Sequence, residues 1–187
     1  MKFATLLRTL LGVILSTLGL ACASTRAPLA SVPSVDPARY AGLWYEVARL
    51  PNPFQKDNER ATAEYIPTDD GRFLVKNTGI KPNGKSRTIS GIATPVPGSG
   101  NARLKVAFTS FPASLVKPPE EGNYWIIDLS PDYQTAIVAS PDRRFLWILA
   151  RSPALPAKKY DALIDRAREL GFNTSRLVTP PEGAMAR

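Results

Sequence analysis

Hydrophobic and polar residues alternate along most of the chain between residues 43 and 151, as they do in strands with two unlike faces. Proline, glycine, asparagine and aspartate interrupt the alternation at short intervals, most clearly at Lys81-Pro82-Asn83-Gly84, a strong hairpin signal. The pattern predicts strands over residues 43–50, 62–66, 72–79, 86–94, 103–111, 124–129, 135–139 and 145–151. Eight antiparallel strands in up-and-down order can close into a barrel with room for one small ligand. The expected fold class is therefore all-β.

Two stretches have a helical pattern instead. Residues 36–40 predict one short turn, with Asp36 as its cap and Pro37 at the first helical position, which would plug the base of the barrel. Residues 156–170 predict an amphipathic helix that stops at Gly171. Packing on the outer barrel wall is favoured over membrane contact for its apolar face, which comprises Tyr160, Leu163, Ile164, Ala167 and Leu170.

The phase of the first strand determines which residues face inward. Strict alternation places Trp44, Glu46, Ala48 and Leu50 on one face, and Leu43, Tyr45 and Val47 on the other. If the first and last strands are neighbours, Arg151 can lie over the Trp44 indole. Such a pair would close a barrel, and it disfavours the alternative of a two-sheet sandwich.

The same phase predicts a mainly apolar inner wall. On the third strand, Phe73, Val75 and Asn77 are favoured over the alternating set of Arg72, Leu74, Lys76 and Thr78. The other inward residues are expected to be Tyr65, Ile89, Leu104, Val106, Phe108, Tyr124, Ile126, Phe145, Trp147 and Leu149.

Not every inward residue is expected to touch a ligand. Ordinary core packing is favoured for the layers around Trp44 and Leu149. Glu46 would place a carboxylate near the barrel floor, where ionisation is resisted. A structural hydrogen bond or ion pair is favoured over ligand contact, and its partner is left open.

The first 21 residues have the features of an export signal. Lys2 and Arg8 provide positive charge, and the apolar run over residues 10–20 is too short to span a bilayer comfortably. The following Cys22 is the only cysteine, so an intramolecular disulfide is excluded. Leu18-Gly19-Leu20-Ala21-Cys22 resembles a bacterial lipobox, which implies a lipidated Cys22. Gly19 stands where leucine is usual, so an ordinary cleavage site that releases a soluble protein is the alternative.

The chain has the length of one domain with a sizeable core. The expected organisation is a lipoprotein signal over residues 1–21, an Ala/Ser/Pro-rich flexible tether over 22–36, the barrel and its helix over 37–178, and a tail over 179–187.

The charge of the chain is positive but scattered. The net charge of +8 falls to +6 when Lys2 and Arg8 leave with the signal. The basic residues occur singly among strands and turns, so a nucleic-acid groove is not expected. Solubility beside a membrane is the favoured role for this charge.

Residues for catalysis are scarce. The chain has no histidine, the commonest general base and metal ligand. Gly98-Ser99-Gly100 lacks the spacing of a nucleophile elbow, and no phosphate-binding fingerprint follows a strand. The acidic pairs Asp69-Asp70 and Glu120-Glu121 fall in turns, where acidic residues are ordinary. A binding protein without cofactor or metal is expected, and an enzyme is not.

Three motifs in order resemble those of the lipocalin family. Gly42-Leu43-Trp44 fits the Gly-x-Trp signature, Asp132-Tyr133 with residues 136–138 resembles the second motif, and residues 147–151 resemble the third. The similarity covers residues 35–178 and is closest in look to the bacterial outer-membrane lipocalins and the apolipoprotein D branch. It implies a barrel with an external helix, and a lid over the mouth formed by residues 52–60. It also implies that Tyr65 and Trp147 touch the ligand.

The sequence therefore predicts a lipid-binding protein that stores or transports lysophospholipids or fatty acids. Its structural motif residues are Gly42, Trp44 and Arg151, and its lipidation site is Cys22. The expected ligand-binding residues are Tyr65, Phe73, Val75, Asn77, Val106, Phe108, Tyr124, Ile126 and Trp147.

The expected location is the bacterial outer membrane, lipid-anchored on the periplasmic face, with a soluble periplasmic or secreted protein as the alternative. Two functional alternatives also stay open. The ligand could be a pigment, a sterol-like molecule or a quinone, or the protein could be a structural envelope lipoprotein that docks a protein partner. The physiological ligand and the oligomeric state, a homodimer included, are left open.

Overall fold

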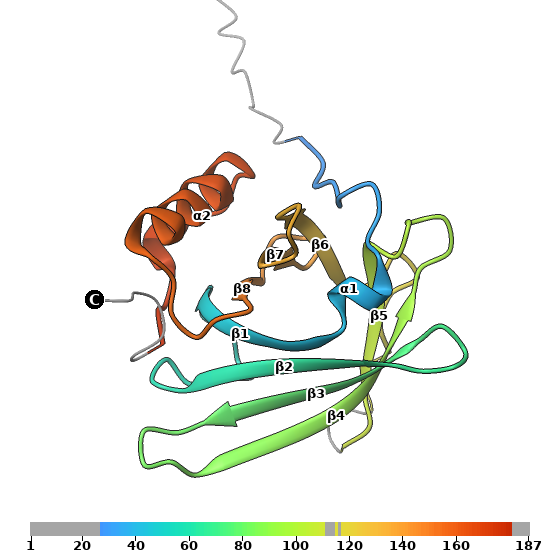
Figure 1. The fold of residues 1–187 in the computed structure, drawn as a ribbon, viewed down its shortest axis with the longest axis horizontal. Coiled ribbons are helices and arrows are strands. Elements are labelled where there is room, and N and C mark those ends of the chain that lie inside the picture. Colours follow the sequence, from blue (N-terminus) through green and yellow to red (C-terminus); the bar gives the residue numbers. More distant parts are fainter. Residues whose placement is uncertain (1–26, 111–114, 116, 181–187) are drawn as a thin grey trace, which may run out of the picture.

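The computed structural model describes residues 27–110, 115 and 117–180. Each strand pairs antiparallel with the next, and the last pairs with the first, so the sheet is a closed barrel (Figure 1). The predicted strand order is confirmed, and the two-sheet sandwich is excluded. The strands are β1 (Gly42–Arg49), β2 (Arg60–Pro67), β3 (Phe73–Ile80), β4 (Ser86–Pro95), β5 (Arg103–Phe108), β6 (Tyr124–Leu129), β7 (Thr135–Ala139) and β8 (Leu146–Ala150).

A short helix, α1 (Pro37–Tyr40), closes one end of the barrel. The Asp36 side chain accepts hydrogen bonds from the backbone N–H groups of Ala38 and Arg39, as predicted for a helix cap. Tyr40 is buried, and its ring centroid lies 5.0 Å from that of Trp44. This end is the floor. The opposite end, where β1 ends and β2 begins, is the mouth.

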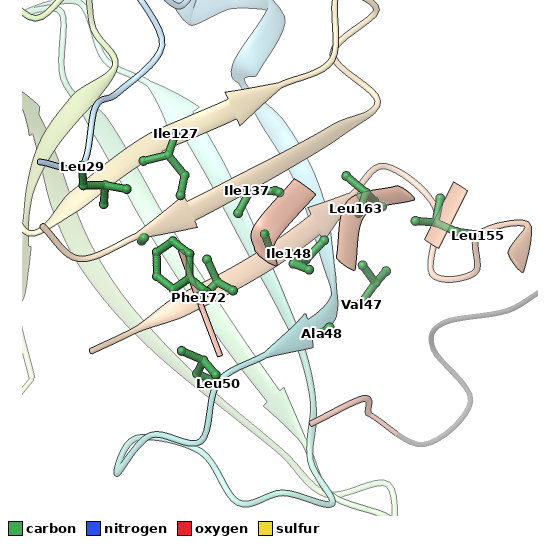
Figure 2. Close-up of a cluster of buried hydrophobic side chains, with 14 residues drawn as sticks. Leu29, Val47, Ala48, Leu50, Ile127, Ile137, Ile148, Leu155, Leu163 and Phe172 are labelled. Atoms are coloured by element: carbon green, nitrogen blue, oxygen red, sulfur yellow. The ribbon is translucent and has the colours of Figure 1, made fainter. Parts of the chain in front are cut away.

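The main helix, α2 (Ala157–Glu169), lies outside the barrel and is followed by the 3₁₀ turn η2 (Thr174–Arg176). Leu163 and Ala167 on α2 pack with Ile137 of β7 and Ile148 of β8 in an outer cluster (Figure 2). The predicted packing of this helix on the barrel wall is confirmed. Within the described residues, no helix has the length and apolar character needed to cross a membrane.

A β-bulge in β1 corrects the predicted phase of that strand. The register against β8 shifts between Glu46 and Ala48. Val47, Ala48 and Leu50 therefore all lie in the outer cluster, whereas the alternation had placed Ala48 and Leu50 with Trp44. A bulge inserts one extra residue into a strand, so every side chain after it changes face. Arg49 makes its contacts with Glu46, a residue on the face that carries Trp44.

The N-terminal segment also differs from the prediction. Residues 27–36, expected to belong to a flexible tether, lie along the barrel. The N–H groups of Val32 and Val35 donate to the carbonyl oxygens of Ile126 and Gly100, and Leu29 and Val35 are buried. The apolar side chains of this segment therefore pack against the barrel. The leader and Cys22 lie outside the described residues.

The start of the predicted tail is packed as well. Thr179 shares a hydrogen bond of 2.7 Å with the hydroxyl of Tyr160 on α2, and Pro180 is fully buried. Residues 181–187 lie outside the part of the chain that the structure describes.

Candidate ligand-binding site

The inward faces of the strands form a second apolar cluster inside the barrel. Val75 lies opposite both Tyr65 on β2 and Gly91 on β4, so these positions share a face. The alternative set on the third strand is thereby excluded. Eight of the predicted inward residues are buried in this cluster, namely Trp44, Tyr65, Phe73, Val75, Leu104, Val106, Ile126 and Leu149, and three are partly buried against it, namely Phe108, Tyr124 and Trp147.

Burial of the inner wall decreases from the floor to the mouth. Trp44, beside α1, is 0% exposed and Phe73 is 3% exposed. Phe108 at the mouth end of β5, Trp147 and Ile89 are each only partly buried. The inner wall is therefore fully covered at α1, and several of its apolar side chains are partly exposed toward the other end.

Three tyrosines join their hydroxyl groups above the floor. The Tyr65 hydroxyl donates to that of Tyr124 at 2.7 Å, and Tyr124 shares a further hydrogen bond of 2.6 Å with Tyr40. Burial raises the pKa of all three phenols, so they remain neutral. Tyr65 lies against Tyr40, with ring centroids 5.3 Å apart, and is therefore close to the floor.

Arg151 links the last strand to the floor, as the sequence predicted. Its guanidinium lies 3.9 Å from the centroid of the Trp44 ring. Nη1 donates to the Leu43 carbonyl at 2.8 Å, and Nη2 donates to the carbonyls of Arg39 and Ala41 at 2.8 Å. Gly42 has a φ of +93° in this turn, and a Cβ there would lie 3.4 Å from the arginine. Glycine is therefore favoured at this position.

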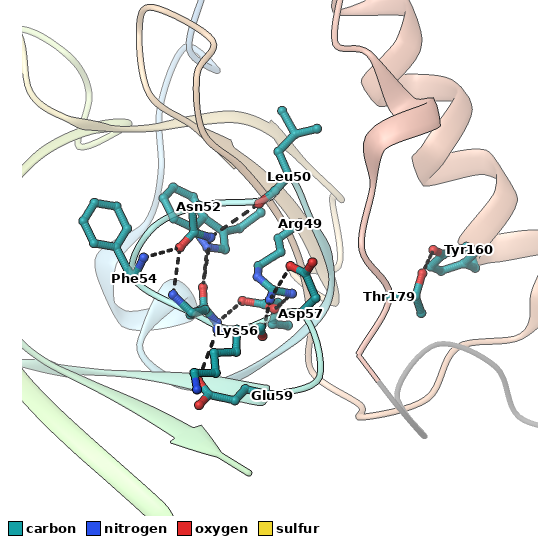
Figure 3. Close-up of polar contacts among 12 residues, drawn as sticks. Arg49, Leu50, Asn52, Phe54, Lys56, Asp57, Glu59, Tyr160 and Thr179 are labelled. Atoms are coloured by element: carbon teal, nitrogen blue, oxygen red, sulfur yellow. Dashed lines mark hydrogen bonds and ion pairs between the residues drawn. The ribbon is translucent and has the colours of Figure 1, made fainter. Parts of the chain in front are cut away.

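The lid segment after β1 is hydrogen-bonded to the inner wall. Gln55 donates from Nε2 to the Glu46 carboxylate at 2.8 Å, and its Oε1 accepts from the Trp147 indole N–H at 3.2 Å. Arg49 contacts Glu46 at 3.3 Å and donates to the Lys56 carbonyl at 2.6 Å (Figure 3). We call Glu46, Arg49, Gln55 and Trp147 the latch.

The latch supplies the partners of Glu46 that the sequence left open. Burial raises the pKa of this carboxyl group, and the hydrogen bond from Gln55 and the charge of Arg49 partly offset the shift. Sequence reasoning missed Arg49 because the bulge hides its direction. It missed Gln55 because a contact between a loop and a strand face leaves no periodic signal.

Two buried polar atoms of the inner wall have no hydrogen-bond partner among the described residues. They are Oδ1 of Asn77 and Nε of Arg49. A buried donor or acceptor without a partner costs about 1–3 kcal/mol. The polar end of a ligand could supply the missing partner for Asn77, which the sequence singled out as a polar ligand contact.

Comparison with a family model and with known proteins shows which family the chain belongs to. The family model described as a lipocalin-like domain matches residues 35–182. Temperature-induced lipocalin-1 of Arabidopsis thaliana is 38% identical over 163 residues, which cover 83% of this chain and 87% of that protein. Outer membrane lipoprotein Blc of Escherichia coli K12 is 34% identical over 161 residues, 84% of this chain and 86% of Blc. Mouse apolipoprotein D is 32% identical over 77% of this chain and 75% of its own length.

Solved structures share the fold at lower identity. Apocrustacyanin C2 superposes with a TM-score of 0.58 and 20% identity, over 87% of this chain and 92% of that one. Insecticyanin from the tobacco hornworm Manduca sexta gives a TM-score of 0.58 at 19% identity, over 82% of this chain and 84% of its own.

Proposed function

Because the chain belongs to the lipocalin-like family, whose members typically bind small hydrophobic ligands, we propose that its barrel carries the acyl chain of a lysophospholipid or a fatty acid. The observation that carries this proposal is the apolar inner wall, sealed by α1 and partly exposed at the mouth. Phe108, Trp147 and Ile89 would contact the chain, and Asn77 Oδ1 would accept a hydrogen bond from a hydroxyl group of the ligand, such as the free glycerol hydroxyl of a lysophospholipid.

The size of the apolar contribution supports an acyl ligand. Burial of one methylene group is worth about 0.8 kcal/mol, so a chain of roughly sixteen carbons supplies on the order of 12 kcal/mol gross. Association and ordering cost at least about 4 kcal/mol. The remainder, up to about 8 kcal/mol, corresponds to binding in the micromolar range without any catalytic group. An apolar wall accepts many acyl chains, so broad selectivity is expected.

The same proposal includes a place in the bacterial cell envelope. Four matched relatives are named outer membrane lipoprotein Blc, from two strains of Escherichia coli, from Vibrio cholerae and from Citrobacter freundii. Cys22 lies directly after the apolar leader, where an acyl anchor would be attached. We place the protein on the periplasmic face of the outer membrane. A native N-terminus that starts at an acylated Cys22, by mass spectrometry, would support this location, and an unmodified N-terminus at Ser24 would refute it.

Binding is tested with the mature chain after removal of bound lipid. Calorimetric titration with a lysophospholipid, and separately with a fatty acid of equal chain length, should give saturable one-to-one binding. Trp147→Ala should weaken this binding because Trp147 belongs to the inner cluster near the mouth. Trp125→Ala is the matched control, since that indole packs against the outer cluster and should leave affinity unchanged.

The outcome also separates the remaining alternatives. A ligand of another class, such as a pigment or a quinone, would compete with the acyl lipid and bind more tightly. If the folded protein bound none of these molecules, the interior would be filled by its own side chains, as the tyrosines and the latch already do in part. A structural lipoprotein that docks a protein partner would then be the better account.

A further inference from the structure

A pocket lies outside the barrel, beside its mouth. It has a volume of about 420 Å³ and lies between the end of β1, the β7–β8 turn and the segment after α2. Its base is apolar, because Leu50 and Phe172 are buried there. Its lining consists of Leu50, Pro51, Arg143, Arg144, Gly171, Phe172, Asn173 and Arg176.

The charge of this pocket is positive. Three arginines line it, and no acidic residue does. Arg144 is 72% exposed and forms an ion pair with Asp142, which lies just outside the lining. Arg143 donates to the carbonyl oxygens of Leu170 and Ala27. Arg176 is exposed and has no ion-pair partner in the described part of the chain.

An exposed aromatic side chain continues this surface across the mouth. Phe54 on the lid is 59% exposed, and its ring centroid lies 5.4 Å from that of Phe145. The Arg144 guanidinium in turn lies 5.5 Å from the Phe145 centroid. We call Phe54, Arg143, Arg144 and Arg176 the basic rim. It combines cations with one apolar side chain, the composition that suits an anionic lipid surface.

The path of the N-terminal segment brings the predicted anchor to the basic rim. Residues 27–36 run along the outside of the barrel from the β7–β8 turn toward α1, and the Ala27 carbonyl accepts a hydrogen bond of 2.8 Å from Arg143. Five residue steps separate Ala27 from Cys22, and a fully extended chain covers at most about 18 Å in that length. An anchor at Cys22 would therefore hold the mouth end of the barrel, and not the floor, close to the membrane.

We infer that the basic rim docks on the anionic surface of the bilayer that holds Cys22, so that the barrel mouth faces the lipid from which a ligand is taken or to which it is returned. The proximity of the basic rim to the bilayer rests on the Cys22 anchor, which is part of the proposed function. The charge and the exposed aromatic ring are properties of the rim itself and do not depend on that anchor. A basic residue at such a surface raises partition to the bilayer about fivefold, and this attraction is screened by salt.

The test uses the mature chain with Cys22→Ser, so that no acyl group contributes. Its partition is measured by flotation with vesicles of phosphatidylcholine alone, and with vesicles of equal parts phosphatidylcholine and phosphatidylglycerol. Binding should require the anionic lipid and should decrease with salt. The double variant Arg144→Gln with Arg176→Gln should lower the partition coefficient about twenty-fivefold, at about fivefold for each charge. Both side chains are exposed, so the fold should persist.

A matched control removes the same charge elsewhere. Arg72→Gln with Lys158→Gln changes two exposed cations, one in the turn before β3 and one in the first turn of α2. This control should bind vesicles nearly as well as the parent. Equal losses in both double variants would mean that only net charge matters, and would overturn the docking surface. Absence of binding to anionic vesicles would overturn it too.

The orientation is read with an environment-sensitive dye on a single cysteine, in the Cys22→Ser background. A dye at Ser175→Cys beside the rim should shift to the blue on anionic vesicles, whereas a dye at Asp69→Cys near the floor should not. The opposite pattern would overturn the proposal. Ligand titration in solution is independent of vesicles. Lost lipid binding with retained docking would therefore count against the proposed function alone.

Discussion

Tyr124 is the residue on which the other two floor tyrosines depend for their hydrogen bonds. It accepts from Tyr65 and pairs with Tyr40. Tyr124→Phe leaves both neighbouring hydroxyls without their partner, at a cost of about 1–3 kcal/mol in the free energy of unfolding. Tyr65→Phe removes one donor and leaves the Tyr40–Tyr124 bond intact, so about 1 kcal/mol is expected. Urea unfolding compares the two, and equal losses would contradict the central role of Tyr124.

Glu46 gives the protein a specific pH dependence. Burial raises the pKa of its carboxyl group in the folded state above the ordinary value of 4.5. Folding therefore favours the protonated form of Glu46. The stability that this group contributes is fully present below the pKa that it has in the unfolded chain, and it is lost as pH rises through the pKa that it has in the folded protein. Glu46→Gln should remove this decline of stability with rising pH. Glu64→Gln, which changes an exposed carboxylate, should not. Urea midpoints measured from about pH 4 upward give the result, and an unchanged slope in Glu46→Gln would show that Glu46 does not cause it.

At the scale of elements, Arg151 joins β8, α1 and the start of β1. One guanidinium reaches the carbonyls of Arg39, Ala41 and Leu43 and also lies over an indole. A lysine keeps the charge but cannot match this planar set of donors. Arg151→Lys should lower the free energy of unfolding by about 2–4 kcal/mol, and hydrogen exchange should increase first in α1. Arg168→Lys on the exposed face of α2 is the control, where about 0.5 kcal/mol or less is expected.

The strands and helices were predictable because their signals are local. The cap at Asp36, the apolar face of α2 and the turn at 81–84 each depend on neighbouring residues, and the structure reproduces them within a few positions. The bulge after Glu46 was not predictable in this way. Val47 and Ala48 suit either face of a strand, so only the pairing with β8 determines which residue is extra. The faces on which Ala48, Arg49 and Leu50 lie all follow from the position of this bulge.

At the scale of the molecule, the sequence indicated that the barrel closes through Trp44 and Arg151. It did not indicate which side chains fill the floor and the mouth of the barrel. The phase of the strands correctly placed Phe73, Val75 and Leu104 inside. The tyrosine network and the latch join residues up to 92 positions apart, as in the bond from Trp147 to Gln55. No periodicity encodes such pairs. The prediction that Tyr65 and Trp147 touch a ligand stays a prediction.

The sealed floor and the latched mouth together set the route of a ligand through the molecule. Entry and exit should require the lid to leave the wall, because Gln55 bonds to both Glu46 and Trp147 across the opening. Gln55→Ala removes these hydrogen bonds, each worth about 0.5–1.5 kcal/mol, and should raise the population of the open lid roughly tenfold. Association and dissociation of an acyl ligand should both accelerate by about that factor, and the dissociation constant should change little. Stopped-flow tryptophan fluorescence measures both rates, with Asn58→Ala on the same loop as the control. Unchanged rates in Gln55→Ala would mean that the ligand bypasses the lid, and the latch would then serve only to stabilise the fold.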